Sequence, residues 1–372
     1  MRLSPALTRT AGLAAVLCLI VVVATVLGQS GSPRLGRATG TALIMLLLVV
    51  GLSVFVGGSG IFSFGHLAFM GVGAYTTAIV TMSPAQKSFQ LPGLPSALAS
   101  LQLSGTVAAL LSGAVATVFA AVLSLPIMRL SGLTASLATV AILIAVHSVF
   151  QNWDAVTRGS AGLIVDADQP GITTLLVWAC LGVVAAVVFR QSRVGMRLAA
   201  GREDEVAARA LGIRVWWERG LAFAVSAFLV GVAGSLFAQY FGSLSPESFY
   251  LTLTFTAIAM LVVGGLTSVS GAVVGTLVLS VVLELLRSVE RGTTVGGWEI
   301  PHRSGLTEVG LAVVLLVVLL ALPAGITGGR ELDPAAAVRR LARRRRPAGP
   351  PPSTVDDPRP VDSTQPVDST QA

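Results

Sequence analysis

Charge is the first thing that the sequence lacks. Only 12% of its 372 residues are Asp, Glu, Lys or Arg, whereas 53% are apolar. An ordinary soluble domain carries about 25% charged residues. A water-soluble fold of this length would leave a large apolar surface exposed. The composition therefore argues against a soluble protein and indicates a chain that folds in a lipid bilayer.

Cysteine and lysine are also scarce. Cys18 and Cys180 lie in apolar segments without CxxC or metal-ligand spacing, which argues against a disulfide framework and a metal site. Lys87 is the only lysine, so almost all of the basic charge behind the net charge of +7 is arginine. The arginines stand between apolar runs rather than on one folded face, so no nucleic acid is expected as a partner.

The residue patterns of enzymes are missing as well. Gln86 precedes Lys87, so the chain has no G-x-x-x-x-G-K-[ST] P-loop. No Ser/His/Asp, zinc or paired-carboxylate arrangement marks a catalytic centre, and we do not expect an enzyme. Carboxylates within apolar runs, which carry protons or sodium ions in secondary transporters, are nearly absent. Glu284 and His147 lie near the ends of apolar runs, where pairing or snorkelling is expected rather than ligand binding.

What the sequence does contain is a series of apolar runs near the roughly 20 residues that a spanning helix needs. We predict an all-α fold, a polytopic membrane protein of about ten transmembrane helices. The spans are predicted at 11–28, 41–57, 61–82, 106–128, 133–150, 172–190, 219–241, 251–264, 270–288 and 306–322. The run at 251–264 is short enough to be broken or re-entrant. The first run resembles a signal peptide, but its length, the lack of an A-x-A site and the following spans favour an uncleaved helix.

The arginines predict the orientation. Most fall in segments that share one side of the membrane if the N-terminus is cytoplasmic, which places both termini in the cytoplasm. We predict a transmembrane domain over residues 1–329. From residue 330 the composition changes to a basic cluster, Arg343 to Arg346, followed by a Pro-, Ser- and Asp-rich stretch. Residues 330–372 are predicted to form a disordered cytoplasmic tail, whose arginines fix topology and are suited to anionic lipid.

The longest polar segment between spans is 191–218, and it contains a predicted short helix at 202–212. Acidic residues in its first turn suit the helix dipole, Glu205 and Arg209 form an i,i+4 pair, and Gly212 suits the position after a helix end. A small apolar face is predicted for docking to a partner. The residues singled out in this segment are Glu203, Asp204, Glu205, Ala207, Ala208, Arg209, Leu211 and Gly212. An ordinary interfacial helix is the alternative interpretation.

Residues 57–75 combine many glycines with His66, a rare ionisable residue in an apolar run. Gly65, Ala68 and Gly71 recur at a spacing of three, as in close helix packing, and Gly73 follows. Such a segment either packs tightly against other helices or forms a broken helix that lines a pathway. An outer loop at 152–162 is polar, with Asn152, Trp153 and Thr157 as candidate residues and Trp153 also suited to anchoring at the membrane interface.

Four segments in this order resemble motifs of the branched-chain amino acid ABC transporter permease family, M-type rather than H-type, and the resemblance covers about residues 40–325. Residues 63–75 look like SLGHxAFxGxGAY, with Phe64 for Leu. Residues 152–163 look like NWxxLTGGSDGL, with Arg158 and Ala161 departing. Residues 202–212 look like REDExAAxxLG. The segment that begins at Gly264 and Gly265 is similar to GGLGSxxGPxxGA, with departures at Thr267, Ala272 and Thr276.

The resemblance implies a permease subunit for leucine, isoleucine or valine in the cytoplasmic membrane of a prokaryote, with residues 202–212 as the coupling helix that docks on an ATPase. It implies a second permease subunit, two ATP-binding cassette subunits that bind ATP and Mg, and an extracytoplasmic binding protein. This chain would itself carry no cofactor. Three other interpretations stay open: a permease for urea, short amides or other amino acids; an ion-coupled carrier; and a membrane scaffold without transport.

Overall fold

Helix is the dominant secondary structure, as the apolar runs predict. The computed structural model describes residues 5–165, 168–291, 294–295, 298–299, 305–329 and 331. By its internal contacts the chain divides into residues 1–333 and 334–372, and all of the described residues belong to the first unit. The predicted tail from residue 332 onward lies outside the described residues.

The described helices have the following bounds. In chain order they are α1 (Pro5–Gln29), α2 (Pro33–Ser59), α3 (His66–Thr81), α4 (Pro84–Gln90), α5 (Ser96–Ala99), α6 (Gly105–Ile127), α7 (Gly132–Asn152), α8 (Asp154–Thr157), α9 (Ile172–Gln191), α10 (Arg193–Glu203), α11 (Glu205–Ala210), α12 (Val215–Phe241), α13 (Leu251–Gly264), α14 (Val269–Glu290) and α15 (Leu306–Ala321). Two 3-10 turns, η1 (Gly159–Ala161) and η2 (Pro246–Phe249), precede β1 and α13.

Among the described residues, strands form only two short antiparallel pairs. β1 (Leu163–Ile164) pairs with β2 (Ser243–Leu244), with Leu163 opposite Leu244. β3 (Thr294–Val295) pairs with β4 (Trp298–Glu299). The all-α prediction is therefore confirmed, because the strands only connect helices.

Eight helices among the described residues are long and apolar enough to cross a membrane: α1, α2, α6, α7, α9, α12, α14, and α13 taken together with η2. The apolar helices α3 and α15 are shorter. An apolar helix thus stands at each of the ten predicted spans, and eight of them reach spanning length. At the short span 251–264, α13 alone is too short, and η2 supplies the missing length. η2 comes directly before α13 and is separated from it only by Tyr250, which has extended backbone angles.

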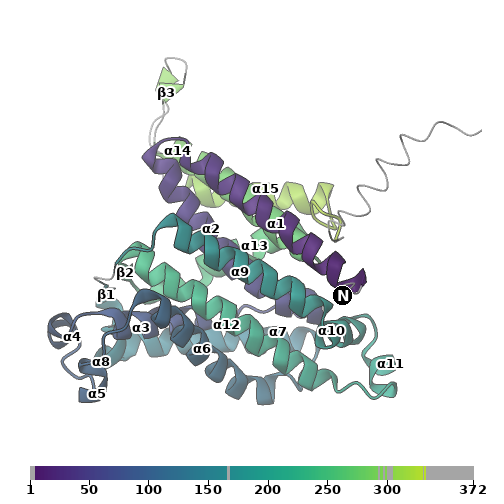
Figure 1. Ribbon diagram of the computed structural model, residues 1–372, viewed down its shortest axis with the longest axis horizontal. Helices are drawn as coiled ribbons and strands as arrows, with labels where there is room; N and C mark the ends of the chain where they lie inside the picture. Colours follow the sequence, from purple (N-terminus) through teal and green to yellow (C-terminus); the bar gives the residue numbers. More distant parts are fainter. Residues whose placement is uncertain are drawn as a thin grey trace, which may run out of the picture. The chain divides into compact units, whose positions relative to one another are not determined.

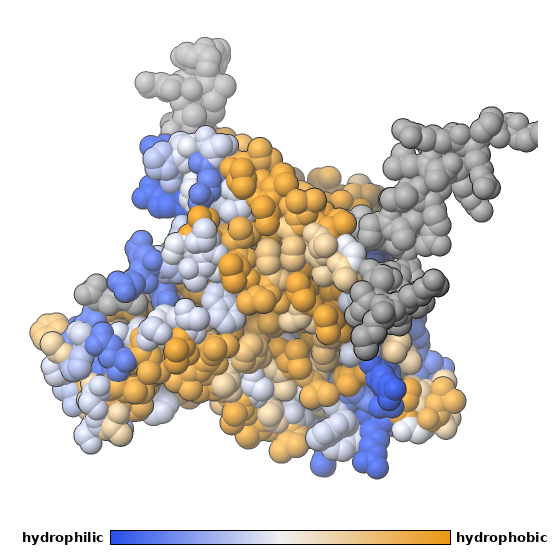
Figure 2. Space-filling model, in the orientation of Figure 1, coloured by the Kyte–Doolittle hydropathy of each residue, from blue (hydrophilic) through white to orange (hydrophobic). Residues whose placement is uncertain are grey.

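The centre of the unit is formed by α2 and α12. α2 is apolar all round, and 89% of its apolar window is buried, whereas only 28% is buried in α1. A helix without a polar face needs protein or lipid on every side, and α2 is surrounded by α1, α9, α12, α13 and α14. α12 packs against α2, α3 and α6 (Figure 1). The exposed Leu and Val side chains of the peripheral helices form a broad hydrophobic band between hydrophilic regions (Figure 2).

The two ends of the helices differ in their connections. One end carries α10 and α11 together with the start of α1, and we call it the arginine-rich end because Arg190, Arg197, Arg202 and Arg219 lie there. The opposite end carries α4, α5, α8 and the β1–β2 pair (Figure 1). The 191–218 segment and the start of α1 thus lie at the same end, and the cytoplasmic position of this end stays a prediction.

The third predicted span begins later than expected. α2 ends at Ser59, and Gly60 follows in the left-handed region with φ +72°. Residues 60–65 are not helical, and α3 begins only at His66. The prediction of a helix from residue 61 was wrong at this end because a glycine with positive φ stops a helix. The span is a non-helical entry followed by a helix of four to five turns.

Candidate functional site

The predicted helix at 202–212 is two helices. Arg202 and Glu203 end α10, and α11 begins after Asp204. Asp204 has extended backbone angles, and its carboxylate accepts hydrogen bonds of 2.9 Å from the N–H groups of Val206 and Ala207. An aspartate that caps a helix in this way cannot also lie inside one, which is why the prediction of a single helix was wrong. Gly212 has φ +80° and ends the segment as predicted.

α11 is anchored to α12 through a carboxylate. Glu205 forms the predicted ion pair with Arg209 and a second one with Arg219 of α12 at 2.9 Å. Burial alone would raise the pKa of the Glu205 carboxyl, but the hydrogen bonds and charges of Arg219 and Arg209 outweigh it and hold this pKa below its ordinary value. Glu205 therefore stays ionised and keeps α11 in one position.

α10 is tied to the spans at two further points. Arg202 donates a hydrogen bond of 2.9 Å to the carbonyl of Gly57, in the last turn of α2, and it also pairs with the exposed Glu203. Arg197 pairs with Glu218 of α12 at 3.3 Å. A displacement of α10 and α11 would therefore pull on both α2 and α12.

The surface that α11 offers to a partner differs from the predicted one. Ala208 is only 2% exposed and packs inside the chain, where α11 contacts α10 and α12. Val206 and Leu211 are 79% and 81% exposed, and Ala207 lies exposed beside them. Exposed apolar side chains at a polar end of a membrane protein indicate a contact surface. We call Val206, Ala207 and Leu211 the α11 surface.

The glycines of α3 serve close packing. A methyl group on Gly73 would lie 2.2 Å from the carbonyl oxygen of Gly231 in α12, so the two backbones touch. A methyl group on Gly65, directly before α3, would lie 2.9 Å from the carbonyl oxygen of Thr139 in α7. A methyl group on Gly71 would contact the ring of Phe150. Ala68 is buried. These glycines lie at close contacts with α7 and α12, and α3 contacts neighbours on several faces rather than along one stripe.

His66 lies in a closed aromatic environment. It is fully buried, and its ring centroid lies 5.2 to 5.7 Å from those of Phe55, Phe69 and Phe223. Its Nδ1 is 2.7 Å from the hydroxyl of Ser63, and its Nε2 has no hydrogen-bond partner among the described residues. His66 thus contacts its own entry segment and not a polar group of a neighbouring helix, and it lines no open pathway.

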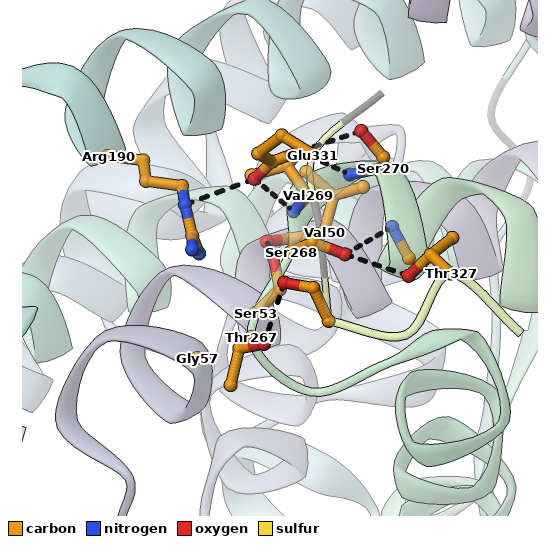
Figure 3. A network of polar contacts seen from close by, with 12 residues as sticks. Val50, Ser53, Gly57, Arg190, Thr267, Ser268, Val269, Ser270, Thr327 and Glu331 are labelled. Atoms are coloured by element: carbon orange, nitrogen blue, oxygen red, sulfur yellow. Dashed lines mark hydrogen bonds and ion pairs between the residues drawn. The ribbon is translucent and has the colours of Figure 1, made fainter. Parts of the chain in front are cut away.

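A polar network closes the turn between α13 and α14 (Figure 3). Glu331 accepts hydrogen bonds from the N–H groups of Val269 and Ser270, at 2.9 and 3.1 Å, and from the Ser270 hydroxyl at 2.7 Å. It also pairs with Arg190, near the end of α9, at 3.0 Å. A carboxylate at a helix N-terminus is favourable. We call Glu331 with these three partners the Glu331 clasp.

Gly264 and Gly265 lie in the same network. Thr327 donates to the carbonyl of Gly264 through both its N–H, at 3.1 Å, and its hydroxyl, at 2.8 Å. A methyl group on Gly264 would lie 1.9 Å from the carbonyl of Gly271, and Gly265 has φ +124°. The segment after α15 therefore folds back onto this turn. Glu331 falls within the predicted tail, because no local sequence pattern marks it as a capping residue.

The outer-loop residues have structural roles. Thr157 is buried. Its hydroxyl lies 2.6 and 2.9 Å from the carbonyl oxygens of Phe150 and Trp153, to which its one hydrogen can be donated, and it accepts a hydrogen bond from the N–H of Gly159. Asn152 ends α7 and bonds to the carbonyl of Ser148. Trp153 is half exposed, in keeping with an interfacial anchor.

Two buried groups escaped sequence analysis. Thr77, Ser112 and Ser235 share hydrogen bonds of 2.6 Å that join α3, α6 and α12, and Gln239 extends the chain. Lys87 of α4 is buried, with its ammonium group on the carbonyls of Leu98 and Leu101. Single hydroxyls within apolar runs give no sequence signal, because the residue pattern does not show which helix faces they share.

A bundle of apolar helices with two polar ends defines a multi-pass integral membrane protein. Residues 35–322 match the family described as the branched-chain amino acid transport system / permease component, and the chain belongs to this family. The family resemblance predicted from the sequence is thereby confirmed.

Curated relatives are permease proteins named LivM and LivH. The chain is 29% identical over 282 residues to the high-affinity branched-chain amino acid transport system permease protein LivM of Salmonella typhimurium, and equally to LivM of Escherichia coli K12. It is 30% identical over 205 residues to LivH of S. typhimurium. These matches cover 66% of this chain with LivM and 50% with LivH. In both cases the chain spans 62% of the relative's length.

Proposed function

We propose that the chain is a permease subunit of an ATP-driven importer for branched-chain amino acids in the cytoplasmic membrane of a prokaryote. It takes the M-type position beside a second permease subunit, two ATP-binding cassette subunits and an extracytoplasmic binding protein. Family membership and the longer match with LivM support this assignment. Substrate moves by alternating access driven by ATP hydrolysis in the partner subunits.

The observation that carries the proposal is the construction of the arginine-rich end. α11 is held by Glu205 on Arg219, and α10 by Arg202 on Gly57 and by Arg197 on Glu218. These contacts make the α10–α11 segment a stiff link to α2 and α12. Its α11 surface is apolar and exposed, which suits docking into a groove on a cytoplasmic ATPase.

Leu211→Asp tests this docking in the complete transporter. Removal of an exposed apolar anchor and addition of a charge should abolish co-purification of the ATPase subunits, while insertion and folding stay normal because Leu211 is 81% exposed. Phe89→Asp is the matched control, since Phe89 is equally exposed and lies on α4 at the opposite end. It should leave the ATPase bound.

Four results would overturn the proposal in whole or in part. An ATPase that remains bound and active with Leu211→Asp would make α11 an ordinary connector. Concentrative leucine uptake by the purified chain alone would show that no ATPase drives transport, and vanadate-insensitive uptake would favour an ion-coupled carrier. Uptake of urea or short amides in preference to leucine by the complete complex would keep the coupling and change the substrate.

A further inference from the structure

A cavity of about 400 Å³ lies between α2, η2, α13, α14 and the end of α12, toward the opposite end from α10 and α11. It falls within the range of roughly 300–1,000 Å³ that small-molecule sites occupy. Its walls combine apolar side chains with hydroxyls and with charges of both signs.

Each of three helices contributes one face to this cavity. α2 presents residues 38, 41, 42 and 45, and α14 presents residues 280, 283, 284 and 287, both in the i, i+3, i+4, i+7 pattern of a single helix face. α13 presents residues 252, 256 and 260. The distance from residue 252 to residue 260 is about 12 Å along the helix axis. The cavity thus runs from the end of the helices toward their middle.

The charged groups of the cavity have hydrogen-bond or ion-pair partners at only some of their atoms. Glu247 is occupied by Gln151 at 2.8 Å and His147 at 3.6 Å. Glu284 receives a hydrogen bond from Arg291 on Oε1, and its Oε2 accepts none from the residues that the structure describes. Arg287, one helical turn further along α14, forms no ion pair or hydrogen bond through its guanidinium with those residues.

Ser280 adds a third polar group without a partner among the described residues. Its hydroxyl is buried and has no partner within the described chain. By contrast, Thr276 and Ser288 of the same helix bond to backbone carbonyls three or four residues earlier, as helical hydroxyls commonly do. Buried polar groups are normally satisfied, and within the described chain the Ser280 hydroxyl is not. With the exposed guanidinium of Arg287 and the half-used carboxylate of Glu284 beside it, the cavity is suited to a polar ligand.

The charge pattern selects the class of ligand. A cation alone would be repelled by Arg287, and an anion alone by Glu284. A molecule with one ammonium and one carboxylate group would complement both charges. Its aliphatic part would pack against Met45, Phe237 and Met260.

We propose that this cavity binds a zwitterionic aliphatic amino acid, with Arg287 facing its carboxylate and Glu284 its ammonium group. The inference rests on the proposed function and adds the binding site to it. The apolar walls then select for side-chain size, and the charged pair selects for the unmodified amino acid.

Cysteine protection in the complete transporter tests the site. Thr256→Cys on α13 and, separately, Thr41→Cys on α2 place a thiol on facing walls, in a background where Cys18 and Cys180 are replaced by serine. Leucine should slow modification of either thiol by a small methanethiosulfonate reagent at least tenfold. Leucinamide, which lacks the carboxylate, and 4-methylpentanoate, which lacks the ammonium group, should not.

Arg287→Gln should abolish protection by leucine. Arg34→Gln is the matched control, because Arg34 is also an exposed arginine toward the same end but does not line this cavity. It should keep protection. Equal protection by leucine and leucinamide, or full protection in Arg287→Gln, would overturn the assignment of Arg287.

Uptake of radiolabelled leucine, measured in the same vesicles, separates the two proposals. Uptake without protection of either thiol would overturn the cavity as a binding site and leave the transport function standing. Protection without uptake would support the cavity and overturn the proposed function.

Discussion

At the scale of single residues, the missing side chain of Gly73 decides how closely α3 approaches α12. We expect Gly73→Ala to destabilise the protein, because the new methyl group would lie 2.2 Å from a backbone carbonyl that cannot move alone. Overpacking of this kind costs about 1–3 kcal/mol. The measurement is the apparent melting temperature in detergent, together with leucine uptake.

Gly36→Ala serves as the control, since a methyl group there meets nothing within 4 Å. It should be neutral or slightly stabilising, because alanine is the better helix former. Gly71→Ala should be milder than Gly73→Ala, since it meets a side-chain ring that can rotate. Equal stability of the Gly73 and Gly36 variants would refute close backbone packing at this crossing.

The Glu205 carboxylate gives the attachment of α11 a defined pH dependence. Because its pKa is lowered in the folded protein, the stabilisation is fully present above the ordinary carboxyl pKa and is lost as pH falls through the lowered value. Hydrogen exchange of the α11 amides should therefore be protected throughout the neutral range and become fast only in acid. In Glu205→Gln, the α11 amides should exchange fast at every pH. If exchange of these amides in the wild type did not become faster in acid, the anchoring role of Glu205 would be contradicted.

At the scale of elements, the Glu331 clasp joins the chain after α15 to the beginning of α14 and the end of α9. Glu331→Ala removes the acceptor of three hydrogen bonds and leaves Arg190 without its partner. We expect a loss of about 1–3 kcal/mol, seen as a lower apparent melting temperature and faster exchange in the first turn of α14. Glu308→Ala is the control, because Glu308 is an exposed acid on α15. It should change neither the apparent melting temperature nor the exchange in the first turn of α14.

The positions of the helices could be predicted from the sequence, but their exact ends and long-range contacts could not. Long apolar runs predicted where all ten apolar helices lie, because the bilayer imposes length and composition on each span. The start of α3 and the break at Asp204 depended on one glycine and one capping side chain, whose local effect outweighs helix propensity. The burial of Ala208 and the position of Glu331 depended on distant partners, and no local pattern encodes those.

At the scale of the whole molecule, the arginine-rich end is predicted to face the cytoplasm. Leu211→Cys and Phe89→Cys, both 81% exposed, report on the two ends in a background without other cysteines. A membrane-impermeant thiol reagent should label Phe89→Cys in intact cells and label Leu211→Cys only after the membrane is opened. Labelling of Leu211→Cys in intact cells would invert the topology and remove the ATPase docking proposal.

The Glu331 clasp also has a consequence for biosynthesis. The carboxylate that caps α14 belongs to the part of the chain translated after every described helix, so α13 and α14 are made before this capping group exists. Until the ribosome delivers Glu331, Arg190 and the first amides of α14 need water or lipid headgroups as substitutes. The nascent permease can therefore reach its final arrangement only after Glu331 has been translated.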